Sequence, residues 1–299
     1  MLRAVLVAAC LCLLWPTALA GSDTPDAPTL ILAHRGQSGY LPEHTLAAYA
    51  YAYAAGADMI EPDVVLTKDG VAICSHDLTL EKTTDAERVF PDRARDDGKW
   101  YAIDFTIEEV RQLRRHGPGG ATPDGFGVAT LVETVAMVQA LNERSGRTVG
   151  IIPEPKAPAF HAAAGVSVED AVLDVLADFG LDETEDPAII QCFDLEALRG
   201  LHDRGAEVRL VYLTGEEPPS ESVLDDVAEF CVGLGPSKRA IERDGELYRD
   251  GWLLKQCRAR GLEVYPYTFR SDREEIGRFV RTYGVDGIFC DFTDIAVEV

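Results

Sequence analysis

Acidic, basic and histidine side chains gather in the first quarter of the sequence, each at the end of a short apolar run. His34 follows TLILA, the pair Glu61 and Asp63 follows ADMI, and His76 follows VAICS. Because side chains on a strand alternate between its faces, Glu61 and Asp63 are expected to point the same way. Two anions on one face repel each other unless a cation or a shared proton compensates. The pair alone fits a cation site and a solvated strand end beside arginines equally well.

A third carboxylate occupies a similar position further along the chain. Glu154 follows the apolar run that ends at Ile152, and Lys156 comes one alternation later. With Glu61 and Asp63 it would place three carboxylates at the end of one sheet. Carboxylate oxygens are hard ligands that suit Ca²⁺ and Mg²⁺ and suit Zn²⁺ poorly. These residue types therefore predict a divalent-cation site, with Ca²⁺ as the expected ion and Mg²⁺ as the alternative.

Two histidines and two basic side chains accompany these acids. An imidazole pKa of about 6.5 would allow His34 and His76 to serve as base and acid at neutral pH. Arg35 could hold a phosphate group through two hydrogen bonds, and Lys156 offers a point charge. A lone histidine at a strand end is more often structural, so the hypothesis depends on both histidines flanking the same carboxylates. The other histidines lack this setting and are expected to be structural or on the surface: His44, His116, His161 and His202.

Taken in order, these motifs resemble the signature of a known family. The segments are HRG at 34–36, PEHT at 42–45, E-x-D at 61–63, HD at 76–77 and PEPK at 153–156. They are similar to those of the glycerophosphodiester phosphodiesterases, and most to the secreted bacterial branch, which carries an inserted segment between its second strand and helix. The similarity extends from about residue 29 to residue 299. HRG alone would be weak, whereas the ordered combination is highly specific.

The resemblance implies a (β/α)8 barrel and the same three metal ligands, Glu61, Asp63 and Glu154. The chain departs from the expected pattern at the spacer positions inside the two metal motifs, which are Pro62 and Pro155. Proline cannot donate to a sheet ladder. Since both prolines lie at strand ends and face away from the site, we expect the arrangement to tolerate them.

Other residues have a role through the resemblance or through their place at a strand end. Gln191 and Tyr267 close strands and resemble family positions near the substrate, and Asp291 closes a strand as well. Glu43 has two interpretations. It is either an acid near the glycerol group, as the resemblance implies, or a carboxylate favoured by the dipole at a helix start.

The resemblance implies hydrolysis of glycerophosphodiesters, such as glycerophosphocholine and glycerophosphoethanolamine, to sn-glycerol 3-phosphate and an alcohol. Three bare carboxylates would repel such an anion, whereas a divalent ion with Arg35 and Lys156 reverses the local charge. The nucleophile is either the substrate's own 2-hydroxyl, which the resemblance favours, or water. The alternatives are a related barrel enzyme that acts on phospholipids or lysophospholipids, and a non-catalytic protein that binds glycerophosphodiesters.

The composition restricts the partners. The chain has 51 acidic and 28 basic residues and a formal net charge of −23. Such a charge repels nucleic acid and anionic lipid surfaces. We therefore expect a small-molecule substrate, no nucleic acid and no stable membrane anchor. The oligomeric state is left open.

The first twenty residues, MLRAVLVAACLCLLWPTALA, are typical of a secretory signal peptide. They combine one basic residue, a short apolar core and an Ala-Leu-Ala end. The core is well below the roughly 20 residues that cross a bilayer. We expect cleavage after Ala20, a linker at 21–28 and a periplasmic or secreted protein, with a lipoprotein signal at Cys10 as the alternative. Five cysteines follow, and their odd number indicates no disulfide framework.

Regular alternation of strands and helices should position these residues. Strands are expected at 29–33, 59–65, 148–152, 188–192, 207–213, 229–234, 262–267 and 287–290. Helices are expected at 46–57, 130–144, 167–179, 195–204, 222–227, 248–260 and 273–283. Eight strands in alternation with helices favour an α/β fold with one TIM barrel over 29–299. No Gly-x-Gly-x-x-Gly loop follows the first strand, which argues against a Rossmann sheet.

Residues 78–128 interrupt this alternation. The segment is rich in charge, proline and glycine, and a loop of this length without structure is rare in a compact domain. We therefore expect a short strand at 71–75 that returns His76 to the site, followed by a small inserted cap with a helix at 107–115. The cap is where we expect substrate selectivity. Its aromatic residues Trp100, Tyr101 and Phe126 either contact the alcohol or form the cap's own core.

Overall fold

A computed structural model describes residues 28–121 and 123–299. The predicted signal peptide at 1–20 and all but the last residue of the predicted linker lie outside the described residues. Within the described ranges, none of the helices combines the length and the apolar character that a membrane span requires.

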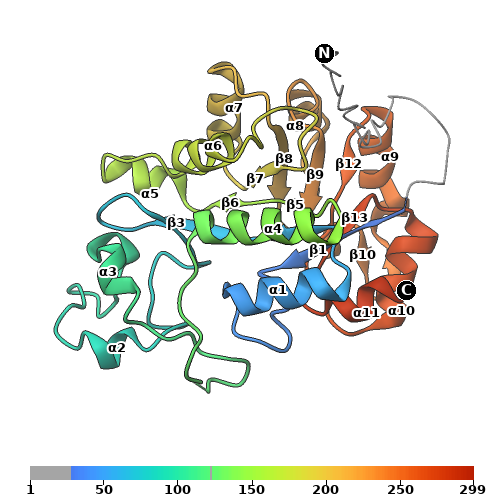
Figure 1. The fold of residues 1–299 in the computed structure, drawn as a ribbon. Coiled ribbons are helices and arrows are strands. Elements are labelled where there is room, and N and C mark those ends of the chain that lie inside the picture. Colours follow the sequence, from blue (N-terminus) through green and yellow to red (C-terminus); the bar gives the residue numbers. More distant parts are fainter. Residues whose placement is uncertain (1–27, 122) are drawn as a thin grey trace, which may run out of the picture.

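Parallel strands form the centre of the molecule (Figure 1). One sheet has the order β13-β1-β2-β5, and a second has the order β12-β9-β8-β7. All neighbours within these two sheets are parallel. The bounds of the first sheet are β13 Gly287–Cys290, β1 Leu30–His34, β2 Met59–Glu61 and β5 Gly150–Ile151. Those of the second are β12 Glu263–Val264, β9 Gly233–Pro236, β8 Arg209–Thr214 and β7 Ile189–Cys192.

Single parallel bridges connect the edges of the two sheets. Ile151 pairs with Ala188 next to β5 and β7, and Phe269 pairs with Cys290 next to β12 and β13. The eight strands therefore follow one another around a ring in chain order, although the hydrogen-bonded ladder is interrupted at these two junctions. This is the strand order that the (β/α)8 prediction requires.

The predicted second strand, 59–65, is divided at Pro62. Its first part is β2, and its second part is β3 (Asp63–Leu66), which pairs in parallel with β6 (Glu154–Pro155) and antiparallel with β4 (Ala72–Cys74). A proline has no N–H for a ladder, so β2 ends beside it. The carbonyl of Pro62 still contributes to strand pairing, because its oxygen accepts from Glu154 N at 2.9 Å.

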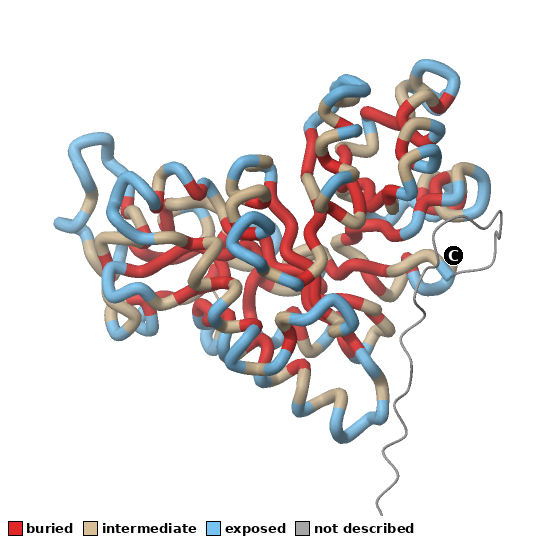
Figure 2. Tube along the Cα trace, turned by 90° about the horizontal axis from the view of Figure 1, so that it is seen from above, coloured by how far each residue is buried: buried red, intermediate tan, exposed pale blue. Residues whose placement is uncertain are grey.

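Helices cover the strands on the outside (Figure 1). They are α1 Leu46–Ala55, α4 Leu131–Ser145, α5 Pro158–Ala163, α6 Val168–Asp178, α7 Leu195–Asp203, α8 Glu221–Val227, α9 Trp252–Ala259, α10 Arg273–Gly277 and α11 Thr293–Val297. A π-helical turn, Arg278–Tyr283, continues α10. The sequence did not predict α5 and α11, which are only one to two turns long. Figure 2 shows that the buried chain is concentrated along the central strands and that the exposed segments lie at the periphery.

Local sequence explains the helix starts. Thr130 caps α4 in a capping box with Glu133, and the two hydrogen bonds measure 3.1 and 2.9 Å. In α1, Tyr49 and Tyr53 are buried and Tyr51 is exposed, which is the spacing of one helix face. The alternating tyrosines therefore belong to a helix and not to a strand.

One predicted helix start was wrong. The segment expected to be helical from residue 248 first forms a short turn, Tyr248–Gly251, before α9. Arg249 and Asp250 adopt positive φ angles of 49° and 52° there, which a helix cannot accommodate. An antiparallel pair, β10 (Glu242–Arg243) and β11 (Glu246–Leu247), precedes this turn.

The apolar side chains of the inserted segment form one cluster with residues of the barrel. The segment contains α2 (Ala86–Val89), a 3₁₀ turn (Ala102–Asp104) and α3 (Ile107–Val110), and it lies at the side of the barrel opposite α9 (Figure 1). Trp100, Phe105 and Leu113 pack there against Val65 and Ile73 of the barrel. The predicted helix 107–115 ends at Val110. At Arg115 the backbone forms an antiparallel bridge with Thr84, and its N–H donates to Phe126 O at 2.8 Å.

Candidate active site

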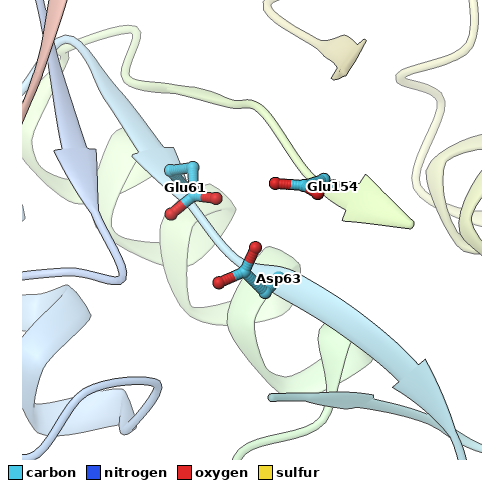
Figure 3. Close-up of side chains that lie close together, drawn as sticks. All are labelled: Glu61, Asp63 and Glu154. Atoms are coloured by element: carbon cyan, nitrogen blue, oxygen red, sulfur yellow. The ribbon is translucent and has the colours of Figure 1, made fainter. Parts of the chain in front are cut away.

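Three buried carboxylates converge at the ends of β2, β3 and β6. One oxygen each from Glu61, Asp63 and Glu154 lies within 4.8 Å of the others, and the three side chains turn toward a common point (Figure 3). The ladder accounts for this geometry, since Asp63 is the register partner of Glu154 and Pro62 separates Glu61 from Asp63. Among the described residues, this is the group of acids, histidines and cysteines with the spacing of a metal site.

The raised pKa values of two of these carboxyl groups indicate that the neighbouring cations neutralise only part of the negative charge. Burial, together with Asp63, raises the pKa of Glu154 to about 8, and burial with both neighbouring acids raises the pKa of Glu61 well above its usual value. Burial would also raise the pKa of Asp63, but Lys156 and other nearby basic groups hold it well below its usual range. A divalent ion fits this set, because its ligands would be oxygens alone and it would relieve the repulsion between them.

Arg35 connects the carboxylates of two different segments. Its backbone N–H donates to Glu61 Oε2 at 2.8 Å from a positive φ of 58°. Its guanidinium donates to both oxygens of Glu43 at 3.0 and 3.2 Å, and its Nε lies 3.2 Å from Asp63 Oδ2. The pKa of Glu43 is low because Arg35 and other basic neighbours outweigh its burial. Glu43 therefore orients Arg35.

Lys156 neutralises the other side of the acidic group. Its Nζ lies 2.6 Å from Glu154 Oε1 and 3.4 Å from Asp63 Oδ1. The carboxylates raise the lysine pKa against the effect of burial, so the ammonium stays charged. Both predicted phosphate-binding cations thus lie beside the three acids.

A carboxylate orients each of the two predicted catalytic histidines. His34 Nδ1 lies 2.7 Å from Asp291 Oδ1, and His76 Nδ1 lies 2.8 Å from Asp77 Oδ1. Such a bond fixes the tautomer and leaves Nε2 for proton transfer. Burial lowers the pKa of His76, which favours its neutral form. The sequence identified Asp291 only as a residue that closes a strand, whereas the structure shows that it is the hydrogen-bond partner of His34.

A cavity of about 150 Å³ joins these groups. Every predicted site residue except Glu43 lines it: His34, Arg35, Glu61, Asp63, His76, Glu154, Lys156, Gln191 and Tyr267. Gln191 Nε2 donates to Glu61 Oε1 at 3.2 Å, and the Tyr267 hydroxyl donates to the carbonyl of Thr214 at 2.8 Å. The strand-end pattern therefore identified the set of residues that the fold brings together.

Two residues near the site were misjudged or missed. His44 was expected to have no site neighbours, yet it is fully buried and its Nε2 lies 3.0 Å from Asp63 Oδ2. Arg115 was treated as the end of a helix, but it is fully buried and its guanidinium donates to Cys74 O and to Thr83 Oγ1. The PEHT motif was a signal for His44, whereas no sequence pattern pointed to Arg115.

The aromatic residues of the cap do not line this cavity. Trp100 is buried in the cluster that the cap forms with the barrel, and its Nε1 donates to Phe90 O at 2.7 Å. Tyr101 stacks on Phe160 of α5, with ring centroids 5.7 Å apart. The expectation that these side chains face the alcohol finds no support here, and the structural alternative holds for Trp100.

Comparisons with known proteins agree on one family. The model of the glycerophosphoryl diester phosphodiesterase family matches residues 34–295. A glycerophosphodiester phosphodiesterase of Treponema pallidum is 36% identical over 90% of this chain and 91% of its own length. The one of Haemophilus influenzae is 32% identical over 90% and 89%.

Solved structures share the fold. A phosphodiesterase of Oleispira antarctica, solved with the product sn-glycerol-3-phosphate, superposes with a TM-score of 0.69 at 22% identity, over 91% of this chain and 96% of that one. A glycerophosphodiester phosphodiesterase of Thermotoga maritima gives a TM-score of 0.62 at 23% identity, over 91% and 98%. The predicted α/β barrel class is thereby confirmed.

Proposed function

The chain belongs to the glycerophosphoryl diester phosphodiesterase family and is a phosphoric diester hydrolase, and from this premise we propose that it hydrolyses glycerophosphodiesters such as glycerophosphocholine and glycerophosphoethanolamine. The products would be sn-glycerol 3-phosphate and the free alcohol. The observation that carries this proposal is the convergence of three buried carboxylates and two carboxylate-oriented histidines on one cavity.

Glu61, Asp63 and Glu154 would hold the divalent ion, with Ca²⁺ as the first candidate and Mg²⁺ as the second. When bound, such an ion supplies positive charge to the phosphoryl oxygens. The hard oxygen ligands and the raised pKa values of Glu61 and Glu154 support this assignment.

His34 and His76 would move the two protons of the reaction. One Nε2 takes the proton of the attacking hydroxyl, and the other gives a proton to the oxygen of the leaving alcohol. Arg35 would hold the phosphate through paired hydrogen bonds, and Lys156 would add a point charge. Gln191 and Tyr267, which line the same cavity, would contact the substrate.

Two routes fit these residues. Attack by the glycerol 2-hydroxyl would give a cyclic phosphate, which water then opens with the roles of the two histidines exchanged. Direct attack by water would give the products in one step. Phosphorus NMR during turnover separates the routes, since only the first produces a transient signal of a five-membered cyclic phosphate.

We further propose export of the mature protein, as in the secreted or periplasmic bacterial branch of the family. The support is the apolar, Ala-Leu-Ala-terminated leader. Amino-terminal sequencing of the exported protein should begin at Gly21. Detection of the protein only inside the cell, with its leader intact, would contradict the proposed export.

The function is tested by release of sn-glycerol 3-phosphate from a panel of glycerophosphodiesters, after chelation and after restoring each metal. We expect no release after chelation and recovery with Ca²⁺ or Mg²⁺. Binding of the diesters without release, in the presence of either metal, would instead favour a non-catalytic binding protein. Release of choline from lysophosphatidylcholine vesicles at a rate that matches release from glycerophosphocholine would favour a phospholipid substrate.

A further inference from the structure

A second cavity adjoins the catalytic one. It encloses about 350 Å³ between the start of α5 and the segment that connects β7 to α7. Its lining includes Glu154, Phe193, Asp194 and Glu196. Glu154 and Phe193 also line the catalytic cavity, so the two spaces meet at these side chains.

The catalytic cavity is small for a whole glycerophosphodiester. At about 150 Å³ it is smaller than the roughly 300–1,000 Å³ that pockets for larger ligands provide. A glycerophosphodiester has two groups on its phosphorus. The second cavity begins at the wall of the first and adds space for one of them.

The charged residues of the second cavity all have the same sign. Glu154, Asp194 and Glu196 are acidic, and no lysine or arginine belongs to the lining. The Asp194 carboxylate caps α7 by accepting from Ala197 N at 3.1 Å. The Glu196 side chain is 84% exposed, and its carboxylate lies 3.9 Å from Arg199 Nε, which is outside the lining. Because Glu154 is a proposed metal ligand, Asp194 and Glu196 are the acids that favour a positively charged group over a neutral or anionic one.

Phe193 offers an aromatic surface at the junction. It is among the few large apolar side chains that are exposed, at 45%. On the catalytic side, Lys156 Nζ lies 5.7 Å from its ring centroid. Tyr267 meets the ring edge-on, with centroids 5.8 Å apart. A half-exposed ring beside acidic groups is suited to a cation–π contact with a quaternary or primary ammonium.

We propose that this second cavity receives the alcohol moiety of the substrate, and that Phe193 with Asp194 and Glu196 selects alcohols that carry a positive charge. This inference rests on the proposed function, because it assumes that the phosphorus occupies the catalytic cavity. It assigns selectivity to the segment after β7 and not to the inserted cap.

The first test compares kcat/KM for glycerophosphocholine with that for glycerophosphoglycerol, whose alcohol is neutral. We expect the wild type to prefer the choline diester. Phe193→Leu should lower kcat/KM for the choline diester by about 5- to 30-fold more than for the glycerol diester, the range of a cation–π contact. Tyr51→Leu removes another exposed aromatic ring, at 43%, on α1 and is the matched control.

A second variant tests the acids without disturbing the helix start. In Asp194→Asn the amide oxygen can still cap α7, while the charge is removed. Combined with Glu196→Gln it should reduce the preference for choline by about 2- to 5-fold, as expected for partly exposed charges. The reduction should disappear at high salt, because exposed charges are screened.

A binding measurement separates this inference from the proposed function. Saturation-transfer NMR would compare choline with its uncharged isostere 3,3-dimethylbutan-1-ol, and it needs no turnover. Preferential binding of choline that Phe193→Leu abolishes would support the cation site even if no diester were hydrolysed. Equal binding of the two alcohols, or an equal loss of kcat/KM for both diesters in Phe193→Leu, would overturn the inference.

Discussion

Nε2 of His44 lies 3.0 Å from Oδ2 of Asp63, and both side chains are buried. Burial lowers the pKa of His44 to about 4, so the ring is neutral at pH 7 and its Nε2–H donates to the carboxylate. Nδ1 then accepts from the Tyr49 hydroxyl at 2.8 Å. The imidazole thus fixes the direction of one of the three proposed metal ligands.

Loss of this imidazole should weaken metal binding. His44→Leu removes the donor and allows the Asp63 carboxylate to turn. We expect an increase of about 10- to 100-fold in the Kd for Ca²⁺, the usual effect of removing a partner of a metal ligand, as measured by calorimetry. His202→Leu removes an exposed imidazole on α7 and should bind Ca²⁺ as the wild type does. Unchanged affinity in His44→Leu would contradict the prediction.

The three carboxylates should make stability depend on the metal. At 100 times its Kd, Ca²⁺ should stabilise the protein by about 2.7 kcal/mol. Glu61→Gln should have opposite effects in two conditions at pH 8. With EDTA it should raise Tm, because the raised pKa of Glu61 means that this buried carboxyl destabilises the folded state at pH 8. With Ca²⁺ it should lower Tm, because one ligand is lost. Thermal scans with and without EDTA measure both, and the same sign in the two conditions would exclude this account.

His161 should make the protein sensitive to acid. It is buried in α5, and burial lowers its pKa to about 4, whereas the unfolded chain has the ordinary value of about 6.5. As the pH falls from about 6.5 to 4, the unfolded state binds a proton that the folded state excludes, so stability is lost in this range.

His161→Leu should remove this loss. Between pH 8 and pH 5 we expect its unfolding free energy to fall by about 1–3 kcal/mol less than that of the wild type, from urea titrations. At pH 8 the two proteins should differ little, since the wild-type ring is neutral there. His202→Leu should behave as the wild type at both pH values. Parallel pH profiles for His161→Leu and the wild type would show that the ring does not titrate in this way.

Arg115 should matter for both stability and activity. It joins the cap to the carbonyl of Cys74, two residues before His76. Arg115→Lys keeps the charge but loses the forked geometry, which should lower the unfolding free energy by about 1–3 kcal/mol and reduce kcat. Arg111→Lys changes an exposed residue of the same segment and serves as the control. A fully active and equally stable Arg115→Lys would contradict this link.

The bond between Asp291 and His34 should be needed for proton transfer. An asparagine at 291 can donate to Nδ1 and so favour the wrong tautomer. Asp291→Asn should therefore lower kcat by about 10²- to 10⁴-fold, as expected for general acid–base catalysis, and change the pH–rate profile. The substrate KM should change little. Asp244→Asn, in the exposed turn after β10, provides the comparison. A loss of substrate affinity alone would assign Asp291 to binding.

Periodicity within a segment predicted most of the fold. Apolar runs gave the eight strands in order, and the strand at 287–290 has the predicted bounds. The predicted helix at 130–144 matches α4 to within one residue at each end. These signals are local, because a strand or a helix cap depends on residues a few positions apart. Short elements such as α5 and α11 carry too few residues for such a pattern.

Contacts between distant segments were beyond this kind of prediction. Asp291 is 257 positions from His34, and no spacing rule connects two loops that meet only after the barrel forms. Arg115 was predicted only as the end of the helix 107–115, whereas its backbone pairs with Phe126 and Thr84 in the folded protein. The site residues that the sequence did indicate are those that end a strand, because the strand itself determines where they lie.

Strands on the two sides of the single-bridge junctions contribute different groups to the site. The groups proposed for bond cleavage, from His34 to Glu154, come from the sheet β13-β1-β2-β5 and from the three-stranded sheet β4-β3-β6, whereas Gln191, Phe193 and Tyr267 come from the part of the barrel that contains β7 to β12. Substrate range could therefore diverge by mutation in one half while the reaction centre in the other is inherited intact. Grafting the segment after β7 between homologues is a direct route to redesigned enzymes of this kind.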